Sequence, residues 1–339
     1  MAVRVGVIGA GAMGGAHVRT LAGSVSGADV VAVADADTAR AAQVAGAARV
    51  YEDGFALIEY DGIDAVLVAS SDQTHEGFVL ACLAAGKPVL CEKPLATSGP
   101  AAERIVAAEA ELGRRLVEVG FMRRHDTGYR GIRGALRDGR IGEPLMLHCV
   151  HRNPHAPPWF ESGMLVTSSL IHELDVARWL LGRELASATV RAPRASRHAQ
   201  PGLLDPQFIL LETDDGVLVD VEVFVNAQYG YEVRCELVGE LGTVSLPSPA
   251  VPCVRSAGAA GTALAGDYLD RFGDAYRSEL QAWVDGVADG ALRGPSAWDG
   301  YAANAAGDAC LAALESGRTE PIALAERPAL YEPEGVRPI

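Results

Sequence analysis

The chain has 339 residues, which is enough for two domains, and its 49% hydrophobic and 22% charged residues are typical of a protein with a full core. A formal net charge of −15 leaves no basic excess to neutralise phosphates, so no nucleic-acid partner and no anionic membrane partner is expected. The chain begins directly with a strand pattern and holds no apolar run that could span a bilayer, so we expect a cytoplasmic protein. Its six cysteines are scattered without a C-x-x-C pair, so we expect neither a disulfide framework nor a metal site.

A glycine-rich turn follows the first predicted strand, Val3–Ile8. In the G-x-G-x-x-G pattern the first glycine permits a tight turn, the second lets a pyrophosphate approach the backbone, and the third lets the next helix pack closely. A second strand at 30–34 ends at Asp35, roughly 20 positions later, where an acidic residue binds the ribose hydroxyls of a dinucleotide. The pattern therefore predicts a cofactor site made by Gly9, Gly11, Ala12, Met13, Gly14 and Asp35.

The predicted cofactor is NAD. The carboxylate of Asp35 would accept hydrogen bonds from the ribose hydroxyls and repel a 2′-phosphate. Ala36 and Asp37 carry no positive charge, and Arg40 lies a turn further along the chain.

Short apolar strands alternate with helical patterns as far as residue 119, which predicts an α/β domain with a doubly wound parallel sheet, a Rossmann domain. Predicted strands at 49–51, 65–69, 88–91 and 116–119 alternate with predicted helices that end near 45 or lie at 55–59, 76–85 and 101–112. The polar loop 70–75 follows one strand, at the edge where open α/β sheets bind ligands, and it offers Ser70, Ser71 and His75 as cofactor contacts. Glu92 and Lys93 follow the next strand at the same edge and are further candidate cofactor contacts, and the ammonium group of Lys93 can polarise a hydroxyl or carbonyl oxygen there.

The pattern changes after Phe121. A helix at 129–137 precedes longer alternating strands at 145–151, 186–192, 208–212, 217–225, 232–238 and 243–246, which predict a large open, mostly antiparallel sheet. Late helices at 268–285 and 296–314 should cover its apolar face or pack on the first domain, and 247–266 reads as a mobile loop. We therefore predict an NAD-binding domain at 1–122 and a substrate-binding and oligomerisation domain at 123–339.

Polar residues recur along a predicted helix at 168–182. Ser168, His172 and Asp175 have the spacing i, i+4 and i+7, which puts them on one helical face. The spacing fits a buried hydrogen-bond cluster and a proton-transfer site equally well, since histidine titrates near neutral pH. His151 and Asn153, at the end of the strand 145–151, would point to the same side.

Taken together, these motifs resemble the Gfo/Idh/MocA oxidoreductase family, and within it most closely the bacterial inositol 2-dehydrogenases. The resemblance rests on the glycine pattern with Asp35, on Glu92-Lys93-Pro94, and on the segments 120–124, 151–154 and 171–175, in that order. It spans nearly the whole chain and implies a Rossmann domain followed by an α/β domain with a large open sheet. It also implies NAD-dependent oxidation of a secondary hydroxyl of a cyclic polyol to a ketone, in a homo-oligomer that is a tetramer in many members.

The resemblance also implies roles for individual residues. Lys93 and His172 would be catalytic, with His172 as the general acid and base. Hydroxyl groups of the substrate would be bound by Arg123, His151, Asn153, Ser168 and Asp175. The chain departs from the inositol dehydrogenases at Ser168, where those enzymes typically carry an aspartate.

Two other functions fit the same motifs. One is a sugar dehydrogenase or ketoreductase of this family that acts on another pyranose. The other is a non-catalytic NAD-binding sensor that keeps the fold. The presence of both Lys93 and His172 argues against the sensor, because a scaffold needs neither.

Overall fold

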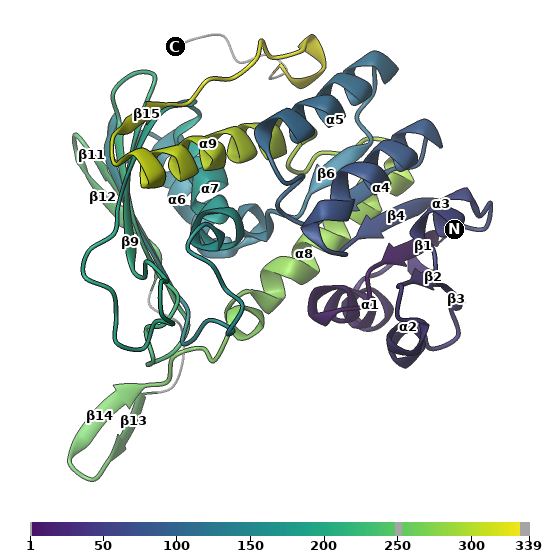
Figure 1. Cartoon of the computed structure of the whole chain (residues 1–339), viewed down its shortest axis with the longest axis horizontal. Coiled ribbons are helices and arrows are strands. Elements are labelled where there is room, and N and C mark those ends of the chain that lie inside the picture. The colour runs from purple at the N-terminus through teal and green to yellow at the C-terminus, as the bar shows by residue number, and fades with distance from the viewer. Residues whose placement is uncertain (1, 248–252, 333–339) are drawn as a thin grey trace. The chain divides into compact units, whose positions relative to one another are not determined.

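The computed structural model describes residues 2–247 and 253–332, which divide into two compact units (Figure 1). The first unit comprises the described residues of Met1–Met122, Tyr276–Ala305 and Leu324–Ile339, and the second comprises those of Arg123–Ala275 and Ala306–Ala323. The chain therefore enters each unit more than once. The division of cofactor and substrate binding between 1–122 and 123–339 stays a prediction. No helix in the described part of the chain is long and apolar enough to cross a membrane.

The first unit is built on a parallel sheet with the strand order β3-β2-β1-β4-β5-β6, which confirms the predicted Rossmann fold. Its central strands are short and buried, as expected where helices cover both faces. The strand order reverses between β1 and β4, and ligands bind at such a switch point. The strands are β1 Val3–Ile8, β2 Ala28–Ala34, β3 Arg49–Tyr51, β4 Ala65–Val68, β5 Val89–Cys91 and β6 Val117–Val119, and the helices are α1 Ala12–Ser24, α2 Thr38–Ala45, α3 Gly54–Glu59, α4 Asp72–Ala84 and α5 Gly99–Leu112.

Helix α4 begins earlier than predicted. The sequence analysis placed 70–75 in a loop and began the helix at 76, but the helix begins at Asp72 with Ser71 at its N-cap. An acidic residue in the first turn interacts favourably with the positive end of the helix dipole, and this outweighed the polar composition of the segment. His75 therefore lies on the helix, and only Ser70 and Ser71 of the candidate contacts remain in the connection.

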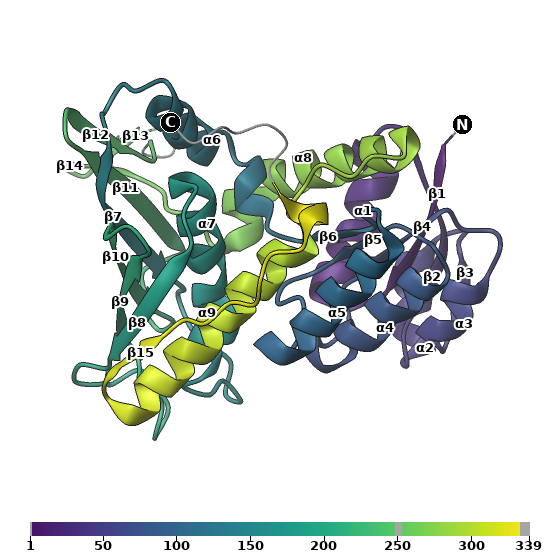
Figure 2. The same cartoon turned by 90° about the horizontal axis from the view of Figure 1, so that it is seen from above.

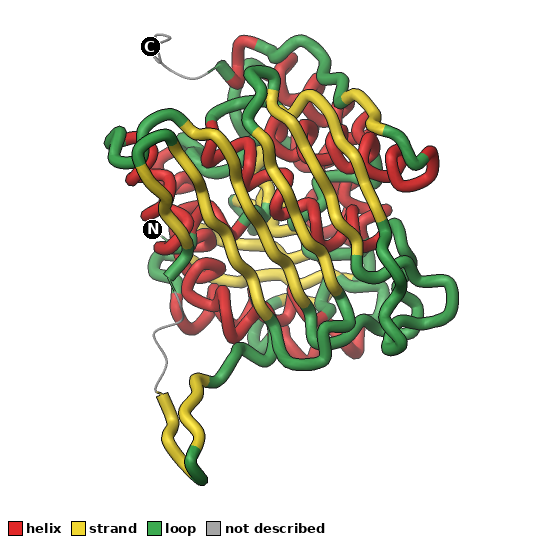
Figure 3. The backbone as a smooth tube through the Cα atoms, turned by 90° about the vertical axis from the view of Figure 1, so that its left-hand side faces the viewer, coloured by secondary structure: helices red, strands yellow, loops and turns green. Residues whose placement is uncertain are grey.

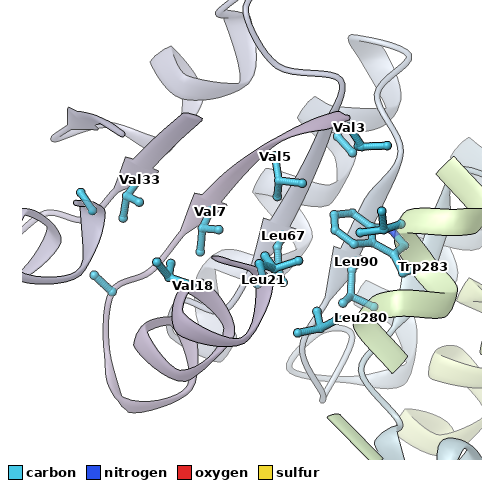
Figure 4. Packing of buried hydrophobic residues seen from close by; sticks show 14 of the residues in the cluster. Val3, Val5, Val7, Val18, Leu21, Val33, Leu67, Leu90, Leu280 and Trp283 are labelled. Atoms are coloured by element: carbon cyan, nitrogen blue, oxygen red, sulfur yellow. The ribbon is translucent and has the colours of Figure 1, made fainter. Parts of the chain in front are cut away.

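A late helix completes the core of the first unit. Helix α8, Tyr268–Asp289, contributes Leu280 and Trp283, and both side chains are fully buried against residues of β1, β4 and α1 (Figure 4). The connection between α1 and β2 is held to the same helix, because the backbone N–H of Ser26 donates to Gln281 Oε1 at 2.8 Å. The first unit therefore depends on residues far beyond the first 122, which close one side of the sheet.

The second unit is built on a mixed sheet with the order β12-β11-β7-β10-β9-β8-β15, seen face-on in Figure 3. Only β10 and β7 pair in parallel, so the predicted open and mostly antiparallel sheet is confirmed. One face is buried: along β7, Leu147, Cys149 and His151 alternate with more exposed residues, and α7 packs beside this sheet (Figure 2). The strands are β7 Pro144–Arg152, β8 Leu185–Arg191, β9 Gln207–Thr213, β10 Leu218–Phe224, β11 Glu232–Gly239, β12 Gly242–Ser245 and β15 Thr319–Pro321, and the helices are α6 Thr127–Arg137, α7 Ile171–Leu181 and the part of α9, Ala297–Ser316, that starts at Ala306.

The predicted mobile loop 247–266 contains a hairpin instead. Strands β13, Cys253–Ser256, and β14, Ala259–Thr262, pair antiparallel (Figure 1), while 248–252 lie outside the described residues. Its turn uses Ala257 and Gly258, with φ of 50° and 76°. Positive φ at both central residues is typical of hairpin turns, and an alanine at the first of them hides that signal in the sequence.

Candidate functional site

In the first unit, the predicted cofactor residues meet at one edge of the sheet. The strands β1, β2, β4 and β5 run parallel, so the segments that follow them emerge at the same carboxyl edge. Those segments carry Gly9, Asp35, Ser70 and Lys93 respectively. The parallel sheet thus brings together residues that are separated by more than eighty positions in the sequence.

The glycine turn is shaped for a phosphate group. Gly9 has a φ of 94°, which L side chains rarely adopt, and a Cβ on Gly14 would lie 1.8 Å from the Gly9 carbonyl oxygen. A Cβ on Gly11 would meet no described atom within 4 Å, so the backbone is open to a ligand there. No side chain among the described residues caps the first turn of α1. These features fit a dinucleotide whose pyrophosphate is bound by the N–H groups at Gly11, Ala12 and Met13.

Asp35 is tied to the glycine turn and to an arginine. Its carboxylate accepts hydrogen bonds from the backbone N–H groups of Ala10, at 2.7 Å, and Asp37, at 2.9 Å. It also accepts two from the Arg40 guanidinium, at 3.1 and 2.6 Å. Burial alone would raise the pKa of Asp35, but these hydrogen bonds and the charge of Arg40 lower it below its usual range. The sequence analysis placed Arg40 a turn away and missed this contact, because it depends on how α2 starts after the β2 strand.

The turn that carries Lys93 is anchored by a buried pair. His17 Nε2 lies 2.7 Å from Glu92 Oε1, and Glu92 Oε2 accepts a hydrogen bond from the Lys93 backbone N–H at 3.1 Å. Burial would raise the pKa of Glu92, yet the hydrogen bond and charge of His17 and the charge of Lys93 lower it. A Cβ on Gly120 would lie 3.0 Å from the Glu92 carboxylate, so glycine is needed beside the pair. His17 was missed by sequence reasoning, and a histidine on the apolar face of the first helix was its only signal.

The other candidate contacts hold this edge together. His75 is 1% exposed, and its ring nitrogens lie 2.7 Å from the Pro94 carbonyl oxygen and 3.2 Å from that of Ser70. The Ser70 hydroxyl is 2.6 Å from the Thr74 hydroxyl. His75 thereby connects the segment after β4 to the turn after β5, and any effect of His75 on a ligand must act through those two segments.

In the second unit, the helix that carries Ser168, His172 and Asp175 is not one continuous α-helix. Leu165–Leu170 form a π-helix, and α7 starts only at Ile171. Ser168 therefore lies in the π-helical part, and the α-helical spacing that placed it on one face with His172 and Asp175 does not apply across the junction. A π-helical segment within a helix is frequent at functional sites and alters the direction in which preceding side chains point.

Glu173 is the centre of a buried cluster in this unit. It pairs with Arg123, and both side chains are 1% exposed. His151 Nδ1 lies 3.2 Å from Glu173 Oε2 and 3.2 Å from Arg123 Nη2. Burial would raise the pKa of Glu173, but the charges of Arg123 and His151 lower it, so the carboxylate stays ionised. The sequence did not point to Glu173, because only Ser168, His172 and Asp175 have the spacing that puts them on one helical face.

His172 lies next to this cluster. It is 7% exposed, and its ring centroid is 6.3 Å from that of His151. The ring of Tyr231 packs edge-on against His151 with the centroids 5.9 Å apart, and burial raises the pKa of Tyr231 to about 12. The sequence analysis did not single out Tyr231. His151 and His172 are therefore both buried, and His151 lies between the charged Arg123–Glu173 pair and the ring of Tyr231.

Asp175 and Asn153 complete the predicted set. Asp175 is fully buried and accepts hydrogen bonds from Arg124 Nε at 3.1 and 3.0 Å, so an arginine next to the predicted Arg123 balances its charge. Asn153 follows β7 and extends its pairing, since its backbone N–H donates to the Phe224 carbonyl at 2.9 Å. The structure thus gathers Arg123, His151, His172 and Asp175 on the buried face of the sheet. The described residues hold no group of three or more potential ligands that could bind a metal ion.

Comparison with known proteins adds to this geometry. Residues 3–121 match the model of an oxidoreductase family with an NAD-binding Rossmann fold, and 133–324 match the C-terminal alpha/beta domain of that oxidoreductase family. The chain belongs to the Gfo/Idh/MocA family. It is therefore an NAD-dependent oxidoreductase, and NAD is its cofactor.

Similar proteins align with nearly the whole length of this chain. Inositol 2-dehydrogenase 2 of Saccharopolyspora erythraea is 54% identical over 336 residues, which cover 98% of this chain and 99% of that protein. Inositol 2-dehydrogenase of Burkholderia cenocepacia is 51% identical over 335 residues, with coverage of 98% and 99%. The crystal structure of myo-inositol dehydrogenase from Lactobacillus casei in complex with NAD(H) and myo-inositol has a TM-score of 0.95 at 40% identity, and covers 98% of this chain and 100% of that one.

Proposed function

We propose that this protein is an inositol 2-dehydrogenase-like enzyme, which oxidises a secondary CH–OH group of a cyclic polyol to a ketone with NAD. The observation that supports this most is the identity of 51% and 54% to two inositol 2-dehydrogenases over 98% of the chain. The polar residues of both units agree with such a substrate, because a hydroxyl-rich ring needs a polar partner for each buried hydroxyl. Cytoplasmic location and assembly into a homo-oligomer, expected to be a tetramer, stay predictions.

The proposed chemistry uses Lys93 and His172 to handle the substrate hydroxyl. Bound NAD supplies the hydride acceptor. The Lys93 ammonium stabilises the developing negative charge on the substrate oxygen, and His172 accepts the hydroxyl proton as a general base. The Lys93 backbone N–H donates to Glu92 Oε2 at 3.1 Å, so the turn that carries Lys93 is preorganised.

The remaining candidates divide into two proposed roles. We assign His151, Asn153, Ser168 and Asp175 to hydrogen bonds with the other hydroxyl groups of the ring. We assign Arg123 to positioning, because its guanidinium is 1% exposed and pairs with Glu173, which also contacts His151. In this assignment Arg123 affects the substrate through His151, and Glu173 joins it as a second positioning residue.

Ser168 is the observation that keeps a second candidate in consideration. A serine where an aspartate is typical supplies no negative charge beside the histidine, which suits a different ring or direction of reaction. The alternative is a sugar dehydrogenase or ketoreductase of the same family acting on another pyranose.

A substrate panel tests the proposal. Purified protein is incubated with NAD and, separately, with myo-inositol, scyllo-inositol, other cyclic polyols and pyranose sugars, and NADH formation is followed by absorbance. We expect the highest kcat/KM with an inositol and almost none with the Lys93→Met variant. Turnover limited to a pyranose sugar would favour the second candidate. NAD binding without turnover of any compound would refute both and favour the sensor.

A further inference from the structure

The carboxylate of Asp35 has no acceptor capacity left over. An ionised carboxylate offers two oxygens with about four lone-pair sites. Oδ1 accepts from the Asp37 N–H at 2.9 Å and from Arg40 Nη2 at 2.6 Å. Oδ2 accepts from the Ala10 N–H at 2.7 Å and from Arg40 Nε at 3.1 Å. Two ribose hydroxyls that donate to Asp35 must therefore replace two of these four donors.

The four donors are not equally replaceable. The Ala10 N–H belongs to the glycine turn, where the neighbouring Gly9 N–H donates to the Ala34 carbonyl at 2.8 Å. The Asp37 N–H belongs to the cap of α2, where Asp37 accepts from the Arg40 backbone N–H at 3.1 Å. The Arg40 side chain is 49% exposed, whereas the Asp35 side chain is 7% exposed. The guanidinium of Arg40 is thus the donor that can leave, because water can solvate it outside.

We propose that Arg40 is a specificity-determining residue that competes with the ribose hydroxyls of the cofactor for Asp35. Arg40 also has a second effect: its displaced guanidinium stays near Asp35 and reduces the repulsion between that carboxylate and a 2′-phosphate. Arg40 thereby weakens the binding of NAD and softens the rejection of NADP at the same time. This inference depends on NAD as the cofactor and on the first unit alone, so it does not depend on the polyol substrate.

Competition for Asp35 and a purely electrostatic role of Arg40 predict opposite changes in NAD affinity when Arg40 is removed. If Arg40 acted only as a positive charge near an anionic cofactor, its removal would weaken the binding of both NAD and NADP. Competition predicts instead that NAD binds more tightly once Arg40 is removed. An ion pair whose arginine is 49% exposed has a modest free energy, so we expect a gain of about two- to five-fold in NAD affinity. NADP affinity should fall by about five-fold, because the carboxylate of Asp35 then faces the 2′-phosphate without a cation.

Isothermal titration of NAD and NADP in the absence of substrate tests this directly. Arg40→Gln removes the positive charge and the two N–H donors that bind the Asp35 carboxylate. Arg40→Lys keeps the charge but cannot make the two parallel hydrogen bonds, so we expect tighter NAD binding with NADP affinity retained within about two-fold. The matched control is Arg104→Gln, which removes an arginine of α5 that is 61% exposed and pairs with Glu76 of α4.

The expected result is a lower Kd for NAD and a higher Kd for NADP in Arg40→Gln, with both constants unchanged in Arg104→Gln. Melting temperatures of all variants are measured to show that each is folded. An NAD Kd that rises or stays the same in Arg40→Gln would overturn the competition. An NADP Kd that falls or stays the same would overturn the second effect, since Arg40 would then give no help to a 2′-phosphate.

Discussion

Arg123 and Glu173 form an ion pair in which each side chain is only 1% exposed. Arg123 lies in the segment that follows β6, and Glu173 lies on helix α7, directly after His172 in the chain. The Glu173 carboxylate also contacts His151. Two opposite charges in such a place are stable only together, because each would be strongly destabilised there without the other.

We therefore expect single substitutions of this pair to be costly and the double substitution to be milder. Arg123→Met and Glu173→Leu should each destabilise the protein by about 3–5 kcal/mol, because each leaves a buried charge unpaired. The double variant replaces the pair by apolar side chains and should be more stable than either single variant. Urea unfolding of the four proteins provides the measurement, and a double variant less stable than both single ones would contradict the expectation.

Lys93→Met should remove most turnover while NAD affinity stays nearly intact. The ammonium is proposed to act on the substrate oxygen, and the loss of one such group lowers kcat by on the order of 100-fold or more. The Lys93 backbone N–H that donates to Glu92 is unaffected by the substitution. NAD titration of both proteins, together with steady-state rates, checks this. A comparable loss of NAD affinity would place Lys93 in the cofactor site instead.

Ser168→Asp should move the acidic limb of the kcat/KM profile for oxidation to higher pH. A carboxylate at position 168 that reaches His172 would favour the protonated imidazole, which is the inactive form when the histidine must accept a proton. Asp175 is a weak source of such an effect, since Arg124 balances its charge. The pH profiles of wild type and variant are compared with the best polyol of the panel. Coincident limbs would show that Ser168, from its π-helical position, does not influence His172.

His125 should make the protein less stable as the pH falls. Burial, with the charges of Arg130 and Arg124, lowers the pKa of His125 from 6.5 to about 4. The unfolded chain therefore binds the proton more readily, and stability is lost as the pH falls from about 6.5 towards 4. His125→Gln should lose less stability than wild type over that range, measured by urea unfolding at several pH values. His198→Gln, at an exposed histidine, is the control, and equal pH dependence of wild type and His125→Gln would refute the prediction.

Local patterns in the sequence were sufficient for most of the fold. Short apolar runs predicted every strand of the parallel sheet, and the glycine-rich turn depends only on neighbouring residues. The same is true of the neighbouring strands predicted at 208–212 and 217–225, which pair antiparallel as β9 and β10. Strand periodicity and turn geometry are properties of a few consecutive residues, so they can be read before the chain folds.

The electrostatic partners were decided only by the tertiary structure. Glu92 pairs with His17, 75 residues away, and Glu173 pairs with Arg123, 50 residues away. Neither of these separations along the sequence can be derived from a helical or strand repeat. Each is set by the strand order and by which helix covers which face of a sheet. Even the nearby Arg40 reaches Asp35 through a contact between the first turn of α2 and the residue that follows β2. The sequence by itself determined the strands, the glycine turn and the candidate site residues, whereas the packing of the sheets and helices decided which charges are buried and what each of them contacts.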